Sequence, residues 1–228
     1  MVMWNPCLSE MNYRCAVSVA VLFAFAASAG FAEDKSLSKS EIDRFVQQLV
    51  SPNEAPDTRG GSAVYPANYD HESQKKVRAA WQQLWRSGPA AFPCLFDHLD
   101  DIRYSFTEDG GQSDVNWSVG RACLDILHGQ IEPLNVGRRH RLPSYVDHNL
   151  GKPANHNLGT PAEAKKWWGT HKSQSLYEMQ IEALEWIIAE TEKSPDQYSD
   201  ETRKNLKDSL RELCAAKTPL KPVVPWPL

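Results

Sequence analysis

Two stretches, Val77-Arg-Ala-Ala-Trp-Gln-Gln-Leu-Trp85 and Val119-Gly-Arg-Ala-Cys-Leu-Asp-Ile-Leu127, decide the fold of this 228-residue chain. Each has an apolar or small residue at its first, fifth, eighth and ninth positions, which is the spacing of one face of an α-helix. The second stretch follows the first at an offset of 42 residues. We therefore predict two helices with matching buried faces. We place Trp81 and Trp85 in the core, together with Trp186, which also lies among apolar helical positions.

The segment between these stretches adds a third helical pattern. Pro89-Ala-Ala-Phe-Pro-Cys-Leu-Phe-Asp-His-Leu-Asp-Asp101 follows Gly88 and supplies Phe, Leu, Phe and Leu at helical spacing. Taken together, residues 72–131 resemble a HEAT repeat, a two-helix unit that recurs about every 40–47 residues in stacked arrays. The resemblance implies an all-α fold, built as a short HEAT-like helical repeat stack (an α-solenoid). Such a stack implies a binding surface and no catalytic activity of its own.

Two features depart from the HEAT pattern. The chain inserts Ser105–Asn116, which we expect to form a Gly-rich, acidic, hairpin-like loop, and it has Trp81 where a small residue is common. Because a two-helix unit cannot bury both of its faces alone, the rest of the chain must cover the core.

Capping patterns predict the helices that close the stack. Ser38 with Glu41, Thr160-Pro161 with Glu163, and Ser175 with Glu178 have the spacing of capping boxes. We expect further helices over residues 39–50, from 70 or 71 to 86, 161–168, 175–193 and 200–216. On the second of these, we expect Gln74, Lys75, Gln82 and Arg86 to face water. Residues 51–69 contain three prolines and Gly60-Gly61, so we expect a connecting loop there. The segment Lys165–Trp186 also resembles one in uncharacterised secreted bacterial HEAT-like proteins, which brings no activity with it.

The first 32 residues have the layout of a secretory signal peptide. Arg14 precedes the apolar run Ala16–Ala29, and small residues lead to Ala32. A stable membrane span needs about 20 apolar residues, and no second apolar run follows. We therefore predict cleavage after Ala32 and a secreted or periplasmic protein without a stable membrane span. An uncleaved anchor is the alternative.

The expected organisation of the chain follows from these patterns. The net charge is −4 with or without the signal-like segment, which favours a partner other than nucleic acid. Cys94, Cys123 and Cys214 follow the predicted cleavage site, so at most one intrachain disulfide is possible. We expect a signal peptide over 1–32, a single helical HEAT-like domain over 33–218 with its repeat core at 72–131, a basic loop insert at 133–160, C-terminal helices over 161–216, and a Pro-rich tail at 219–228.

The basic insert is the strongest candidate for binding. It carries four permanent cations against one acid, Asp147, and so has a local charge of +3. Guanidinium groups recognise carboxylates and phosphates through paired donors. The expected partner is an unknown protein or an anionic envelope polymer. Alternatively, the insert lies on the chain's own acids, because residues 178–203 contain eight acids and two bases. The candidate binding residues are Arg138, Arg139, His140, Arg141 and Lys152.

A near-duplication within the insert suggests a metal site as a weaker alternative. Asp147–Ala154 and Asn155–Ala162 share most of their residues, and His148 and His156, with His140 and Asp147, include residue types that bind zinc or copper. The loop lacks the fixed spacing of a metal motif, so we predict a duplicated surface loop, no metal and no cofactor.

No catalytic motif accompanies these features. The chain contains no GxSxG, no HExxH and no Gly-rich phosphate loop. The aromatic residues expected at the surface, Trp117, Trp167 and Trp226, suggest a small cell-envelope hydrolase acting on a polysaccharide through two carboxylates. We keep this hydrolase as the alternative and predict a noncatalytic, secreted or periplasmic protein-interaction or scaffold module that is not an enzyme.

Overall fold

Helices form most of the described chain. The computed structural model describes residues 37–109, 113–132, 142–150 and 161–221, all within the compact unit Ser36–Leu228. These residues contain eight α-helices, one 3₁₀ turn (η1, Gly88–Ala91) and two strands. The helices are α1 (Lys39–Gln48), α2 (His71–Arg86), α3 (Phe92–Asp97), α4 (Val119–Ile131), α5 (Tyr145–Asn149), α6 (Pro161–His171), α7 (Leu176–Lys193) and α8 (Asp200–Ala216), and the strands are β1 (Tyr104–Asp109) and β2 (Asp114–Ser118).

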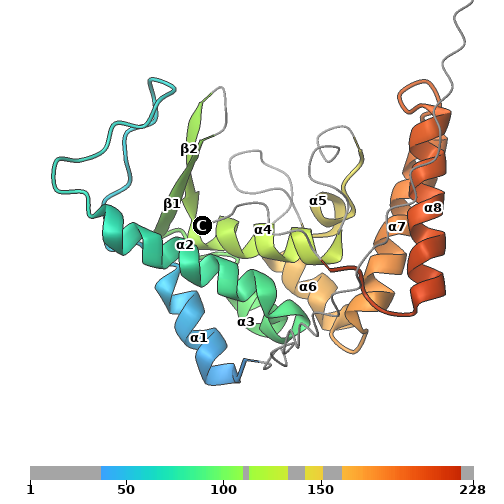
Figure 1. The fold of residues 1–228 in the computed structure, drawn as a ribbon, viewed down its shortest axis with the longest axis horizontal. Coiled ribbons are helices and arrows are strands. Elements are labelled where there is room, and N and C mark those ends of the chain that lie inside the picture. Colours follow the sequence, from blue (N-terminus) through green and yellow to red (C-terminus); the bar gives the residue numbers. More distant parts are fainter. Residues whose placement is uncertain (1–36, 110–112, 133–141, 151–160, 222–228) are drawn as a thin grey trace, which may run out of the picture. The chain divides into compact units, whose positions relative to one another are not determined.

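The two matching stretches form α2 and α4, as the spacing predicts. All eight patterned side chains are buried, with exposed fractions of 4% or less. Helix α4 contacts α2 and α3 on one side and α7 on another, so it lies between the N-terminal and C-terminal helices of this unit (Figure 1). It is buried nearly all round, as expected of a helix surrounded by other elements. The repeat stack itself stays a prediction.

The prediction that Gln74 and Gln82 face water is wrong, because both side chains are buried. Gln74 donates from Nε2 to the carbonyl oxygen of Ser105, at 2.7 Å, and accepts from Ser51 Oγ at the same distance. Helix α2 therefore packs against α1, α4 and the hairpin, and its buried face is wider than the apolar pattern alone indicates. Lys75 and Arg86 are exposed as predicted.

The predicted hairpin-like loop is a two-stranded antiparallel sheet, β1–β2, so the described fold is mostly rather than wholly helical. Side chains tie both strands of this sheet to other segments. Arg78 Nη2 donates to the carbonyl oxygen of Thr107 in β1 at 2.6 Å. Asn116 Nδ2 in β2 donates to the carbonyl oxygen of Pro56 at 2.7 Å.

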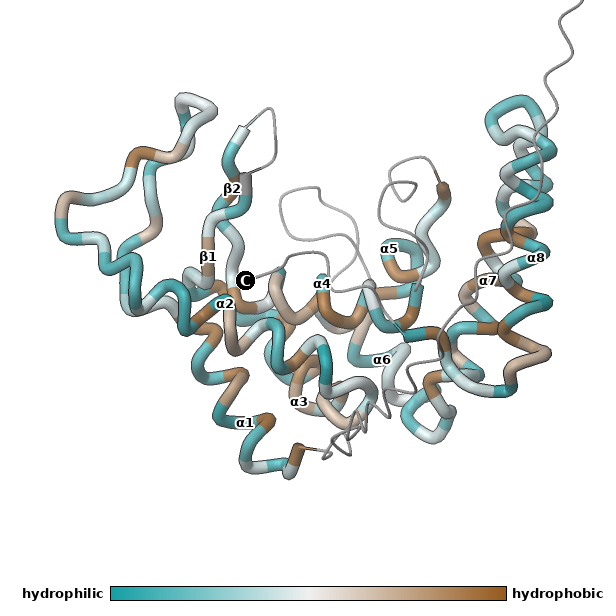
Figure 2. Tube along the Cα trace, in the orientation of Figure 1, coloured by the Kyte–Doolittle hydropathy of each residue, from teal (hydrophilic) through white to brown (hydrophobic). Residues whose placement is uncertain are grey.

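The C-terminal helices α6, α7 and α8 form near the predicted ranges, although α6 continues to His171 instead of ending at residue 168. Ser175 and Glu178 make the reciprocal capping box at the start of α7. Helix α7 packs against α4 and α8. Figure 2 shows hydrophobic residues along α4 and α7, whereas α8 is mainly hydrophilic because only one of its faces is covered. Helix α5, inside the basic insert, is not among the predicted helices.

Trp117 and Trp167 are buried, with exposed fractions of 6% and 7%, so their prediction as surface aromatics is wrong. The Trp117 ring packs against Phe106 across the hairpin, with ring centroids 4.9 Å apart. Trp167 faces inward from α6 and stacks against Phe96 of α3 at 6.0 Å. The spacing of apolar residues along the chain did not reveal their burial, because the rings they pack against, Phe106 and Phe96, lie on other elements. Trp226 lies outside the described residues.

Candidate functional site

The five candidate binding residues, Arg138, Arg139, His140, Arg141 and Lys152, all lie outside the described residues. They belong to two segments, 133–141 and 151–160, for which the structure describes only the flanking positions. Helix α5 lies between the two segments in the chain. The described part of the candidate site consists of α5 and the side chains that hold α5 in place.

Glu132 links the end of α4 to the start of α5, on either side of the first segment. Its side chain is almost fully buried, with an exposed fraction of 4%, at the C-terminal end of α4. Its Oε1 accepts a hydrogen bond from Ser144 Oγ at 3.0 Å and another from the backbone N–H of Val146. Glu132, which precedes the first segment, is therefore bonded to Ser144 and Val146, which follow it.

A histidine completes this cluster. His128, one turn before Glu132 on α4, places Nε2 2.9 Å from Glu132 Oε2. The carboxylate also lies at the N-terminus of α5, where its charge interacts favourably with the free N–H groups of the first turn. A buried carboxylate is tolerated when donors surround it, as they do here.

A second carboxylate, Glu182 of α7, also holds the first turn of α5. Tyr145 donates its hydroxyl hydrogen to Glu182 Oε1 at 2.5 Å and accepts from Trp167 Nε1 at 3.0 Å. Burial acts to raise the pKa of Glu182, but hydrogen bonds from Tyr145, His171 and Gln174 outweigh it and leave that pKa below its usual value. Burial also raises the pKa of Tyr145 above its usual range. The pair therefore consists of a neutral phenol donating to an ionised carboxylate.

His171 links this pair to α6. Its ring stacks on Trp167 with centroids 4.1 Å apart and an angle of 10° between the planes. Its Nε2 lies 3.2 Å from Glu182 Oε1, and its Nδ1 lies 2.7 Å from the carbonyl oxygen of Trp167. Helices α5, α6 and α7 therefore meet at one hydrogen-bonded cluster.

His148 of α5 is the exposed aromatic residue of this region. It stacks on Trp186 of α7, with ring centroids 4.8 Å apart and a plane angle of 30°. Trp186, which we predicted in the core, is only half-buried and packs against the edge of the core. The Tyr145 ring meets its ring at 5.9 Å and 72°. Of the residues proposed as metal ligands, the structure describes only Asp147 and His148. Among residues 37–109, 113–132, 142–150 and 161–221, no group of three or more His, Cys, Asp or Glu side chains could hold a metal ion.

Most of the acids of residues 178–203 have partners already. Glu185, Asp196 and Glu201 form no ion pair within the described ranges. The other five acids are paired as follows: Glu178 with Ser175, Glu182 with Tyr145 and His171, Glu190 with Lys193, Glu192 with Lys207, and Asp200 with Arg203.

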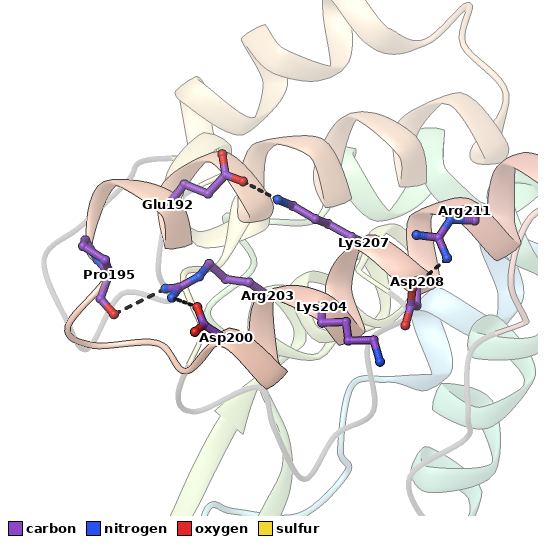
Figure 3. A pocket seen from close by; sticks show the side chains of 8 residues that line it. All are labelled: Glu192, Pro195, Asp200, Arg203, Lys204, Lys207, Asp208 and Arg211. Carbon is purple, nitrogen blue, oxygen red and sulfur yellow. Dashed lines mark hydrogen bonds and ion pairs between the residues drawn. The ribbon is translucent and has the colours of Figure 1, made fainter.

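An open hollow of 520 Å³ lies between the end of α7 and the face of α8 (Figure 3). Most of its charged side chains form ion pairs with one another. Such pairs near the surface contribute little to the stability of the fold. Within the described chain, Lys204 is the lining cation without an ion pair. The lining residues are Glu192, Pro195, Asp200, Arg203, Lys204, Lys207, Asp208 and Arg211.

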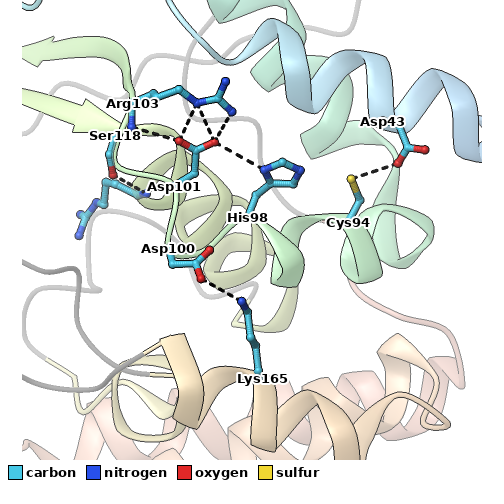
Figure 4. A network of polar contacts seen from close by, with 9 residues as sticks. Asp43, Cys94, His98, Asp100, Asp101, Arg103, Ser118 and Lys165 are labelled. Carbon is cyan, nitrogen blue, oxygen red and sulfur yellow. Dashed lines mark hydrogen bonds and ion pairs between the residues drawn. The ribbon is translucent and has the colours of Figure 1, made fainter.

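A separate polar network fixes the start of α4 (Figure 4). Asp101 accepts from Arg103 Nε at 2.9 Å, and this bond lowers the pKa of Asp101. His98 Nδ1 lies 3.6 Å from the same carboxylate. The carbonyl oxygens of Asp101 and Arg103 accept from the N–H groups of Gly120 and Val119, both at 2.9 Å. This network is structural, because it joins α3, the hairpin and α4.

Sequence reasoning missed the residues that hold α5: Glu132, His128, Tyr145, His171 and Glu182. Most of them meet across more than ten positions of sequence, and no local pattern encodes such a contact. One signal was present. Ser144 with Asp147 has the spacing of a helix start, and the Ser144 hydroxyl does cap α5.

No family model, curated protein or solved structure shows a significant match to this chain. In the part of the chain that the structure describes, no helix combines the length and hydrophobicity that crossing a membrane requires.

Proposed function

We propose that this chain is a noncatalytic, secreted or periplasmic interaction module that binds an acidic partner, a protein or an anionic envelope polymer, through its basic insert. The observation that carries the proposal is the Glu132 cluster. It links the end of α4 to the start of α5, the described positions on either side of residues 133–141. A loop whose flanking residues are fixed loses less conformational entropy on binding than one with free ends, which supports a binding role for the insert.

The pairing of the chain's own acids supports an external partner. The alternative is that the insert lies on the acids of residues 178–203. Five of those eight acids already accept hydrogen bonds or form ion pairs, which leaves Glu185, Asp196 and Glu201 in the described residues. Three exposed acids on separate turns offer weak pairing to four cations. We therefore favour a partner of higher charge density.

We further propose that the scaffold behind the insert is a short HEAT-like stack. The matching buried faces of α2 and α4 support it, and so does the packing of α3 against α4. Helices α6, α7 and α8 would then cover the exposed end of the stack.

The hydrolase alternative has less support. A general acid in glycoside hydrolysis needs a carboxyl group whose pKa is raised. For every described carboxyl group whose pKa shift is resolved, the pKa is lowered: Asp57, Asp70, Asp100, Asp101, Glu178, Glu182 and Glu192. Two of the aromatic residues that suggested sugar stacking, Trp117 and Trp167, are buried.

A charge-reversal experiment tests the proposal. The chain without its first 32 residues serves as bait in cell-envelope extract, beside a variant with Arg138, Arg139 and Arg141 changed to Glu. Bound material is identified by mass spectrometry, and helicity is compared by circular dichroism. We expect a partner that the wild type captures and the variant does not, at equal helicity.

A matched control separates local from overall charge. Lys75, Lys76 and Arg86 are exposed on α2, so changing all three to Glu alters the net charge equally at residues outside the insert. Capture should survive in this control. Equal capture by both variants would refute the role of the insert.

A further inference from the structure

The hollow between α7 and α8 carries more cations than acids. Four of its eight lining residues are permanent cations and three are acids, so its local charge is +1 in a chain whose net charge is −4. The four cations, Arg203, Lys204, Lys207 and Arg211, all belong to α8. The volume of 520 Å³ lies within the range of about 300–1,000 Å³ that small-molecule sites occupy. Charge and size together favour a small anionic ligand.

One of these cations, Arg203, has a structural role. Its guanidinium donates to the carbonyl oxygens of Pro195, at 3.3 Å, and Tyr198, at 2.5 Å. It also donates to the carboxylate of Asp200 at 2.6 Å. These bonds tie the first turn of α8 to the segment that connects it with α7. Arg203 therefore fixes one end of the hollow and is not available to a ligand.

The other three cations can reach one ligand. Lys204, Lys207 and Arg211 lie at positions i, i+3 and i+7 of α8, so they share one face on successive turns. All three are exposed, and their long side chains can turn toward a common point. Lys204 has no ion pair in the part of the chain that the structure describes, and Figure 3 draws no interaction to its ammonium group. Its ammonium group is therefore free to receive a ligand.

The present partners of Lys207 and Arg211 can be exchanged easily. Lys207 Nζ lies 2.7 Å from Glu192 Oε1 of α7, and both side chains are half exposed. Arg211 Nη1 lies 2.8 Å from Asp208 Oδ1, one turn earlier on α8. Ion pairs this exposed contribute little, because water and salt compete with them. A ligand with more negative charge than a carboxylate can therefore replace Glu192 and Asp208 at small cost.

We propose that Lys204, Lys207 and Arg211 form a binding site for a phosphate group, either inorganic phosphate or the phosphate of a monoester. A phosphate monoester carries a charge of about −1.5 to −2 at pH 7 and three strong acceptor oxygens, one for each cation. Hydrogen bonds between charged donors and such oxygens are short and strong, and a guanidinium can donate two at once. The site lies on α8, outside the basic insert, so it does not depend on the proposed function.

A small carboxylate fits the hollow less well than a phosphate group. It carries a single charge, as Glu192 and Asp208 do, so it gains little by replacing them. Acetate is therefore a suitable comparison anion.

An NMR titration tests the inference, because it reports where on the chain an anion binds. The isotope-labelled protein is titrated at pH 7 and constant ionic strength with inorganic phosphate, with glycerol phosphate and with acetate. The test variants are Lys204→Ala and Glu192→Gln. The control is Lys166→Ala, which removes an exposed lysine from α6 and so changes the net charge as much as Lys204→Ala does.

We expect phosphate and glycerol phosphate, but not acetate, to shift the backbone amide signals of residues 204–211. Lys204→Ala should weaken this binding about fivefold, whereas Lys166→Ala should bind like the wild type. Glu192→Gln should tighten it, because Lys207 then has no competing carboxylate. Tighter binding of glycerol phosphate would identify a monoester as the ligand. Binding of inorganic phosphate that is at least as tight would identify the free anion.

Three results would overturn the inference. The first is that neither phosphate probe shifts the signals of α8. The second is that acetate shifts them as strongly as phosphate does. The third is that Lys204→Ala and Lys166→Ala weaken phosphate binding equally. None of these results bears on the basic insert, because its residues give separate signals.

Discussion

Gly129 of α4 lies directly against the indole ring of Trp85 of α2, so closely that a Cβ atom at this position would overlap the ring. The Trp85 ring is completely buried. Next to it, Gln130 Nε2 donates to the carbonyl oxygen of Trp85, which ties the two helices together at the same level. The contact between α2 and α4, the two matching stretches, therefore depends on the absence of a side chain at one residue.

Replacing Gly129 by Ala should destabilise the fold. The added methyl group must displace the Trp85 ring, and overpacking of this kind costs about 1–3 kcal/mol. Urea unfolding followed by circular dichroism measures the change. Gly169→Ala is the control, since no atom lies within 4 Å of a Cβ atom there. It should stabilise α6 slightly, because Ala is a better helix former. A neutral Gly129→Ala would show that the α2–α4 contact is looser than described.

The helices could be predicted from the sequence where local chemistry defines them. The capping boxes at Ser38 and Ser175 place the starts of α1 and α7, because the capping side chain and its backbone partner lie three residues apart. The burial of Gln74 could not be predicted. Its partners, Ser51 and Ser105, lie on distant segments, and a polar side chain on a helix face is expected to be solvated until such partners are known.

Removing the Glu132 carboxylate should loosen α5. Glu132→Ala leaves the N–H of Val146 and the hydroxyl of Ser144 without their acceptor, at a cost of about 1–3 kcal/mol for a buried donor. Hydrogen exchange should show faster exchange of the Val146 amide than in the wild type. Glu201→Ala, at an exposed acid, should leave that rate unchanged. Unaltered exchange in Glu132→Ala would contradict the role of Glu132 in fixing the insert.

The Glu182 carboxylate should make stability depend on acid pH. Its pKa in the fold is lower than the ordinary value of 4.5, so its contribution is fully present above pH 4.5 and is lost as the pH falls through the lower, folded pKa. Glu182→Gln should therefore be less stable than the wild type at pH 7. The difference in stability between the two proteins should shrink as the pH falls below 4.5. A difference that stays constant throughout an acid titration would mean that the ionised form of Glu182 is not what stabilises the cluster.

The Cys94 thiol should react slowly despite being partly exposed. Burial and the hydrogen bond to Asp43 (Figure 4) raise its pKa to about 12, so the reactive thiolate is scarce at pH 8. Cys214 is exposed and should be alkylated first, whereas Cys123 is fully buried and should react only after unfolding. Timed alkylation with mass spectrometry measures the order. Asp43→Asn should speed the labelling of Cys94, and Cys94 reacting as fast as Cys214 would disprove this prediction.

The charge of the candidate site could be predicted from the sequence, but its support could not. Arg138, Arg139 and Arg141 are recognisable as a cluster because they are neighbours in the chain. Glu182 reaches Tyr145 across 37 positions, and its role depends on the packing of α7 beside α5. The aromatic pair of His148 and Trp186 arises in the same way, from two helices that only the fold brings together.

The most direct test of the central claim compares the two triple charge reversals in binding to the captured partner at one ionic strength. The account predicts that the Arg138, Arg139 and Arg141 to Glu variant loses binding, while the Lys75, Lys76 and Arg86 to Glu variant keeps at least most of it. Equal affinities for the two variants would contradict the claim that the basic insert is the binding surface.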